Sequence, residues 1–217
     1  MNAPFSVVEG LAIPLPLENV DTDTIIRVEH LLDVQRETLR RHAFEMLKYD
    51  ADGAPAPGCA LNDTDLDGAP ILVAGRNFGC GSSREPAVWA VQALGIRAVL
   101  AESFGDIFAS NCGQNGVLAA RLPAASIDAL MHEARARRPL RVDLGARQVV
   151  TVDGRALHFD IDAWQRERLL AGGEELDLLL RELPDIAAWQ AADRARRPWA
   201  WSLPASPLTT DSTRNPT

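Results

Sequence analysis

Short apolar runs separated by turn formers divide the first half of the chain. Residues 6–17 alternate apolar residues with turn residues and predict one or two short strands. Residues 70–74 and 98–101 are uninterrupted apolar runs, as expected of strands that are buried on both faces. Between them, residues 86–94 have a helical pattern that ends at Gly95. A strand, a helix and a strand in this order predict a parallel, right-handed βαβ unit.

The apolar pattern changes its period in the second half of the chain. Residues 125–138 place their apolar side chains on one helical face. Residues 140–159 alternate instead, and the pair Asp153-Gly154 within them is a strong signal for a hairpin turn. Four further ranges are expected to be helical: 36–48, 163–170, 174–182 and 186–194.

The last residues carry no such pattern. We expect residues 197–217 to form a mobile tail and residues 1–196 to form the domain. The length of 217 residues suits one α/β domain with an extension. With 47% hydrophobic and 24% charged residues, the chain can bury a sizeable core without disulfides or metals.

The charge of the chain makes several kinds of partner improbable. The net charge is −8 and the sequence pI is about 5.0, so neither nucleic acid nor an anionic membrane is expected to bind. The N-terminus shows no secretory signal and no stretch is long enough to cross a bilayer, so we expect a cytoplasmic protein. An anionic substrate would need a local basic site, which makes individual arginines worth following.

The cysteines and histidines give no sign of a metal site. Cys59, Cys80 and Cys112 are widely spaced and form no C-x-x-C pair, so we expect reduced thiols and no zinc or iron–sulfur cluster held by this chain. Any such cofactor must come from another chain. The four histidines match no metal or triad spacing and are assigned no role: His30, His42, His132 and His158.

A glycine-rich loop, Gly75–Glu85, carries the candidate chemistry. It lies between a predicted buried strand and a predicted helix, where free N–H groups and the positive end of the helix dipole favour anions. Gly79 and Gly81 let the backbone approach a ligand closely or adopt a positive φ. Arg84 can grip a carboxylate through two parallel hydrogen bonds. Two hydroxyls stand beside it, those of Ser82 and Ser83.

Other interpretations of this loop compete with anion binding. The Gly-x-x-x-Gly-x-Gly pattern from Gly75 also resembles the nucleotide loop of short-chain dehydrogenases, but those enzymes need a Tyr-x-x-x-Lys downstream and the one tyrosine, Tyr49, lies upstream. We keep two alternatives to catalysis by an anion-binding loop: an NAD(P)-binding oxidoreductase and a non-catalytic interaction module. A phosphate-binding P-loop lacks its lysine before Ser82. Ser82 and Glu85 could also form a capping box for the helix.

Three segments, in order, resemble one family. Residues 77–85 read NFGCGSSRE, a segment typical of the swivelling domain of the aconitase family. Residues 19–26 match the N-V-D-T-D-x-I-I opening of that family. Residues 103–116 resemble its S-F-A-D-I-F…N-C…N-G segment. Over roughly residues 7–190 the chain is most similar to the small subunits of 3-isopropylmalate dehydratases.

This resemblance implies a fold, a partner and a reaction. The fold is α/β, a three-layer β/β/α swivelling domain that closes over a large subunit, and the large subunit carries a 4Fe–4S cluster. The reaction removes water from 2-isopropylmalate and adds it back on the neighbouring carbon to give 3-isopropylmalate, a step of leucine biosynthesis. The cluster is implied to act as a Lewis acid on the leaving hydroxyl.

The resemblance also implies the roles of individual residues. Ser82 is the catalytic base that takes the proton from the adjacent carbon, which requires a strongly lowered pKa of its hydroxyl. Ser83 and Arg84 bind a substrate carboxylate. Four residues support the loop: Thr22, Asp23, Gly79 and Gly81. Three others are expected to hold strand and loop geometry: Ser103, Asp106 and Asn111.

Three departures from the family pattern concern the substrate. Pro86 replaces the histidine that usually follows S-S-R-E, and Arg27 replaces the proline of I-I-P. Residues 33–38 contain no glycine where the family usually has a glycine-containing loop that sorts substrates. A related hydroxy-diacid, such as a methylmalate or a citrate-like or homoaconitate-like acid, is therefore an alternative substrate.

Overall fold

The structure is a computed structural model that describes residues 3–32, 35–172, 180 and 182–201. The chain divides into two compact units, Met1–Glu174 and Glu175–Thr217, and each is described by itself. The first unit contains two four-stranded sheets.

One sheet is entirely parallel, in the order β2-β3-β4-β5. Its strands are β2 (Ala12–Leu15), β3 (Ile71–Ala74), β4 (Ala98–Ala101) and β5 (Leu118–Arg121). Strands β3 and β4 are joined by α4 (Glu85–Ala93), which confirms the predicted βαβ unit. Every residue of β3 and β4 is buried, as the uninterrupted apolar runs require.

The other sheet is antiparallel, in the order β1-β6-β7-β8. Its strands are β1 (Val7–Gly10), β6 (Leu140–Asp143), β7 (Gln148–Val150) and β8 (Ala156–His158). The predicted hairpin joins β7 to β8, and Gly154 in its turn has a φ of 81°. The two strands expected within residues 6–17 are therefore real but belong to different sheets.

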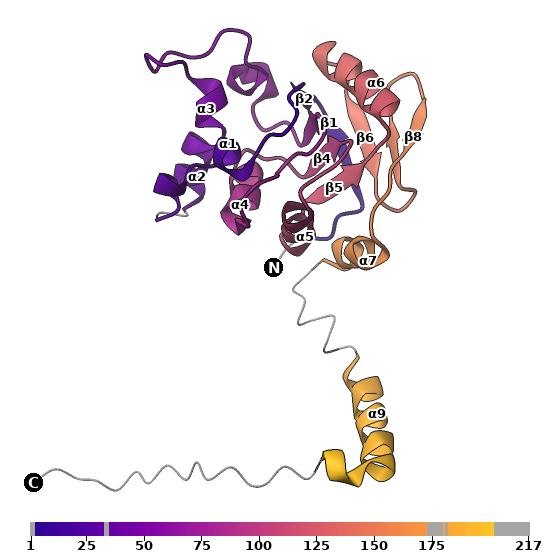
Figure 1. Ribbon diagram of the computed structural model, residues 1–217. Coiled ribbons are helices and arrows are strands. Elements are labelled where there is room, and N and C mark those ends of the chain that lie inside the picture. Colours follow the sequence, from indigo (N-terminus) through magenta and orange to yellow (C-terminus); the bar gives the residue numbers. More distant parts are fainter. Residues whose placement is uncertain (1–2, 33–34, 173–179, 181, 202–217) are drawn as a thin grey trace, which may run out of the picture. The chain divides into compact units, whose positions relative to one another are not determined.

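The parallel sheet separates two cores. In β3, Leu72 and Ala74 pack among the helices, whereas Ile71 and Val73 pack toward the antiparallel sheet. Four helices lie on the first side, and β6 and β8 lie on the second (Figure 1); the helices are α1 (Thr22–Ile25), α2 (Arg36–His42), α3 (Glu45–Lys48) and α4. This is the predicted three-layer β/β/α arrangement.

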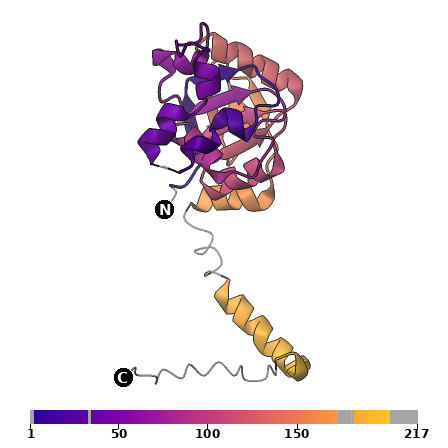
Figure 2. The ribbon, with the colours of Figure 1, turned by 60° about the vertical axis from the view of Figure 1, so that its left-hand side comes forward.

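The remaining helices complete these layers. They are α5 (Asp106–Gln114), α6 (Ala124–Arg135) and α7 (Ala163–Ala171). Three short 3₁₀ turns are η1 (Val28–His30), η2 (Ala60–Asn62) and η3 (Thr64–Leu66). Helices α6 and α7 lie on opposite sides of the unit, as a second view also shows (Figure 2). Their apolar faces join the core between the sheets.

The structure corrects two of the expected helices and adds elements that were not predicted. Residues 36–48 form two helices rather than one, because Phe44 adopts a left-handed φ of 55° and turns the chain between them. Arg137, with a φ of 54°, ends α6 before residue 138. Helix α5 and strand β5 escaped prediction: the nine residues of α5 include several polar ones and little apolar periodicity, so its burial depends on distant neighbours.

In the second unit, α9 (Leu183–Arg196) confirms and extends the helix expected at 186–194. The 3₁₀ turn η4 (Pro198–Ala200) follows it, within the range 197–217 for which a mobile tail was expected. Asp193 is the buried residue of α9 and accepts hydrogen bonds from Arg197 and Trp201. The hydrogen bond from Arg197 is the main reason that the pKa of Asp193 falls to about 2. Most of the helix expected at 174–182 lies outside the described residues, as do residues 202–217.

Candidate functional site

The glycine loop, residues 75–84, leaves the carboxyl end of β3 and ends at α4. Its backbone is left-handed at Asn77, Gly79 and Gly81, with φ values of 58°, 70° and 90°. A Cβ atom on Gly79 would lie 2.2 Å from Cγ of Phe108, so only glycine fits at that position. The predicted need for glycine is thus steric as well as conformational.

Two distant segments flank the loop and continue the parallel pairing of the sheet beyond its strands. On one side, the Gly79 N–H donates to Val20 O at 2.7 Å and the Thr22 N–H donates to Cys80 O at 3.0 Å. On the other side, the Phe78 N–H donates to Ser103 O at 3.0 Å. The loop is therefore held between the two segments that also carry the other family motifs.

Side-chain hydrogen bonds fix the start of the loop. The Asn77 N–H donates to the Ser103 hydroxyl at 2.9 Å, and the Asn77 amide donates to Oδ1 of Asn19 at 2.8 Å. Ser103 therefore holds loop geometry, as predicted. Asp106, in contrast, is highly exposed and lies 3.8 Å from Arg121 in a surface ion pair.

The predicted site residues come together at the far end of the loop. Ser82 and Ser83 are exposed, and the side chain of Arg84 is 17% exposed. Arg84 Nη1 forms an ion pair with Oδ1 of Asp23. The Thr22 hydroxyl, which is buried, donates to the carbonyl oxygen of Ser82 at 3.1 Å. Thr22 and Asp23, which were expected to support the loop, therefore contact Ser82 and Arg84 within it.

The capping box expected from Ser82 and Glu85 does not form. The N-cap of α4 is Arg84, whose backbone is extended and whose side chain makes no capping bond. Because α4 begins at Glu85 and its N-cap is Arg84, Ser82 lies two residues before the capping position. The Ser82 hydroxyl makes no hydrogen bond within the described residues, which leaves it available to a ligand.

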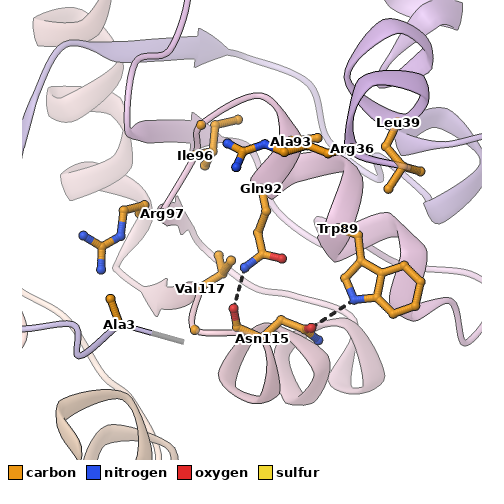
Figure 3. Close-up of a pocket in the computed structure, with 12 residues that line it drawn as sticks. Ala3, Arg36, Leu39, Trp89, Gln92, Ala93, Ile96, Arg97, Asn115 and Val117 are labelled. Atoms are coloured by element: carbon orange, nitrogen blue, oxygen red, sulfur yellow. Dashed lines mark hydrogen bonds between the residues drawn. The ribbon is translucent and has the colours of Figure 1, made fainter. Parts of the chain in front are cut away.

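The side chain of Glu85 serves another purpose. It accepts a hydrogen bond from the amide of Asn115 at 2.9 Å. Asn115 also accepts from Trp89 Nε1 at 2.9 Å and, through its backbone carbonyl, from Gln92 (Figure 3). Asn115 thus fastens α4 along its length to the end of α5. Trp89, Gln92 and Asn115 border a cavity of about 430 Å³, and none of Ser82, Ser83 and Arg84 lines it.

The cysteines are not part of a group with metal-ligand spacing among the described residues. All three are free: Cys112 is buried in α5, and Cys59 and Cys80 are half-buried. Burial raises the pKa of the Cys112 thiol, which disfavours the thiolate that a metal needs. Among the described residues, the side chains that meet with metal-ligand spacing are instead His30, His42 and Glu45.

That trio was missed at the level of sequence. His42 and Glu45 are three residues apart and were a visible signal, but a turn at Phe44 and the distant His30 complete the group.

In the part of the chain that the structure describes, no helix has the length and apolar character that a membrane span requires.

Comparison with known proteins identifies the family. A family model described as the aconitase C-terminal domain matches residues 2–125, and a second one, LeuD_N, matches residues 128–163. The "3-isopropylmalate dehydratase small subunit 1" of Bordetella pertussis is 44% identical over 197 residues, which is 90% of this chain and 98% of that protein. The chain belongs to the 3-isopropylmalate dehydratase small-subunit family.

Other members of the 3-isopropylmalate dehydratase small-subunit family agree. The protein of that name from Roseobacter denitrificans is 41% identical over the same shares of the two chains. A crystal structure of 3-isopropylmalate dehydratase from Methanocaldococcus jannaschii is 28% identical, with a TM-score of 0.60 over 84% of this chain and 99% of that one. Membership confirms the aconitase-type fold and assigns the chain to the hydro-lyases, which removes the NAD(P) oxidoreductase alternative.

Proposed function

We propose that this chain is the small subunit of a hydro-lyase that converts 2-isopropylmalate to 3-isopropylmalate by dehydration and rehydration. The observation that carries the proposal is the open edge formed by Ser82, Ser83 and Arg84. Two hydroxyls are exposed there beside a guanidinium that an ion pair holds in place. Such an edge needs a second protein surface to enclose a substrate, which suits a small subunit that closes over a large one.

Ser82 is the proposed base that removes the proton from the carbon next to the hydroxyl-bearing carbon. Its carbonyl is fixed by Thr22 and its hydroxyl is unengaged within the described residues, so the oxygen can face a substrate from a rigid backbone. The positive charge of Arg84 and the first N–H groups of α4 favour the alkoxide form. After the proton is taken, the same oxygen can return it during rehydration.

Ser83 and Arg84 are the proposed ligands of a substrate carboxylate. One N–H of the Arg84 guanidinium is used by Asp23, and the fork has further N–H groups for a second carboxylate. Asp23 would therefore act as a positioning residue that keeps the guanidinium aimed. This arrangement supports recognition of a dianionic substrate despite the net charge of −8.

We assign the 4Fe–4S cluster to the large subunit, since the three cysteines of this chain do not gather into a ligand set. Their free state also suits the cytoplasm, where we place the assembled enzyme. Nucleic acid and membranes are not among the proposed partners.

Anaerobic reconstitution with a large subunit of the same family tests the proposal, following the unsaturated intermediate by its absorbance. Ser82→Ala should lower kcat by about 10²–10⁴-fold, the usual worth of a positioned acid–base group. Arg84→Lys should lower kcat/KM by about 10- to 100-fold, because one ammonium cannot replace the bidentate grip. Ser126→Ala on α6 and Arg155→Lys in the turn between β7 and β8 are matched controls and should turn over normally.

A panel of hydroxy-diacids in the same assay tests the substrate. Turnover of 2-isopropylmalate far above that of methylmalate, citrate and homocitrate is expected. Near-normal turnover by Ser82→Ala in an assembled complex would make this chain a non-catalytic subunit. Preference for another diacid would instead leave the roles of Ser82 and Arg84 intact and correct the substrate alone.

A further inference from the structure

The side chains of His30, His42 and Glu45 lie outside the glycine loop and contact one another through their polar atoms. His30 ends η1, His42 ends α2 and Glu45 begins α3. Nε2 of His30 lies 2.9 Å from Oε1 of Glu45, and Nδ1 of His42 lies 2.8 Å from Oε2 of the same carboxylate. The three ligand atoms all lie within 4.8 Å of one another. The two imidazole rings are stacked, with centroids 3.6 Å apart.

The backbone that builds this trio is held by the core. Phe44 adopts a left-handed φ of 55°, which costs a bulky residue about 1–3 kcal/mol. Its side chain is fully buried and its N–H donates to Ile25 O at 2.8 Å, so surrounding packing sustains the turn. The turn places His42 and Glu45 on the same side, facing His30. The trio is therefore an imposed arrangement rather than a chance meeting of surface side chains.

We propose that His30, His42 and Glu45 form a binding site for a divalent transition-metal ion, and that Zn²⁺ suits it best. Two imidazole nitrogens and one carboxylate oxygen are ligands that Zn²⁺ takes together, with an open fourth position for water. Bonds of about 2.0–2.2 Å place neighbouring ligand atoms roughly 3 Å apart, close to the two nitrogen–oxygen separations present here. A cavity of about 570 Å³ lined by His42 and Glu45 gives an entry path.

The protonation state of the trio favours a cation. Burial alone would raise the pKa of Glu45, but hydrogen bonds from His42 and His30 and their charges outweigh it, so the pKa lies below its ordinary value. The carboxylate is therefore ionised at neutral pH. Binding requires that Nε2 of His30 and Nδ1 of His42 carry no proton, so each neutral ring must hold its one proton on the other nitrogen. The two rings are nearly parallel, with an interplanar angle of 14°, so at least one of them must turn before an ion can lie in the plane of both.

The positive charge of a neighbouring arginine weakens binding of a metal ion, so the direction in which affinity changes when that charge is removed tests the proposal. Nε of Arg27 lies 3.7 Å from Oε1 of Glu45, and Arg41 lines the same cavity. Both cations repel a dication, whereas Asp50 on the cavity wall attracts it. Removing the Arg27 charge should therefore strengthen metal binding, an effect that a purely structural cluster would not produce.

Calorimetric titration of the full-length chain with Zn²⁺, and visible absorption of bound Co²⁺, test the site. We expect one ion per chain with micromolar or tighter affinity. His42→Ala and Glu45→Gln should each weaken Zn²⁺ binding by roughly 100-fold or more, whereas Arg27→Gln should tighten it several-fold. His158→Ala, on β8 in the antiparallel sheet, is the matched control and should bind as the parent does.

Circular dichroism on each variant separates loss of the site from loss of the fold. Glu45→Gln keeps the size and hydrogen-bonding capacity of the side chain, so it remains folded if His42→Ala does not. The proposal is overturned by absence of Zn²⁺ binding to the parent chain, by unchanged binding in folded Glu45→Gln, or by weaker binding in Arg27→Gln. None of these outcomes bears on turnover by the assembled enzyme, so the site and the proposed function stand or fall separately.

Discussion

The glycine loop and the turn between β7 and β8 use the same kinds of residue. The hairpin combines a glycine of positive φ, Gly154, with the buried Thr151 and with Asp153. The loop contributes only the glycine, Gly79, and its threonine and aspartate partners, Thr22 and Asp23, come from α1. The threonine of the hairpin binds groups two and four residues away. The threonine of the loop binds a carbonyl sixty residues away.

This difference in range separates a turn that reverses the chain from one that assembles a site. A local turn satisfies its own polar groups and presents the rest to solvent. A turn built from two distant segments brings side chains from both to one place, here Ser82 and Arg84 beside Asp23. Changes matched between the two turns should therefore have similar chemistry and different consequences.

The largest contrast is expected for the glycines. Gly79→Ala puts a Cβ into the ring of Phe108 and strains a φ of 70°, which should cost about 3 kcal/mol or more of unfolding free energy and abolish turnover. Gly154→Ala meets open space at a φ of 81° and should cost about 1 kcal/mol with turnover per folded molecule unchanged. Urea unfolding and the reconstituted assay measure both. Equal costs for the two variants would mean that Phe108 moves aside readily.

The aspartates should differ in kinetics rather than in stability. Asp23→Asn removes the ion-pair partner of Arg84, so KM should rise by about 10-fold while unfolding free energy changes by less than about 0.5 kcal/mol, as is usual for a half-exposed pair. Asp153→Asn should leave KM unchanged. A KM for Asp23→Asn equal to that of the parent would show that Arg84 is positioned without its partner.

The threonines should cost similar stability and differ in kcat. Thr22→Val and Thr151→Val each remove a buried hydroxyl that donates a hydrogen bond, worth about 1–2 kcal/mol. Only Thr22→Val frees the carbonyl of Ser82, so kcat should fall several-fold for that variant alone. A kcat loss in Thr151→Val would point to general loosening of the fold instead.

The smallest effect is a dependence of hairpin stability on pH. The hydrogen bond from Thr151 lowers the pKa of Asp153. A carboxyl with a lowered folded-state pKa stabilises the protein above its unfolded-state pKa, about 3.9, and this contribution is lost as the pH falls further. The difference in urea midpoint between the parent chain and Thr151→Val should therefore shrink between pH 6 and pH 3. A constant difference would show that the hydroxyl, not its charged partner, accounts for the stability.

Local features of the fold were predictable and long-range ones were not. A few neighbouring residues are enough to predict the fully apolar strands β3 and β4 and the Asp153-Gly154 turn. The break at Phe44 did not, because a bulky residue takes up a left-handed conformation only when the surrounding core compels it.

The candidate site divides in the same way. The glycine loop and its Ser82, Ser83 and Arg84 were visible as a pattern and through the family resemblance. Two other features could not be predicted. The ion pair of Arg84 with Asp23 joins residues sixty-one positions apart, and the trio of His30, His42 and Glu45 depends on a turn with no local sequence signal. The capping box expected from Ser82 and Glu85 failed because the helix begins at Glu85, which makes Arg84 the N-cap.

The pairing of the glycine loop with segments around Val20 and Ser103 also bears on how the protein folds. Contacts between residues so far apart in sequence demand that much of the chain be ordered first, which slows their formation. The loop should therefore be among the last parts to reach its native conformation, and substitutions within it should accelerate unfolding more than they slow refolding. The subunit would then become competent for catalysis only after β2, β3 and β4 have paired. A partly folded subunit would present no formed site to its partner.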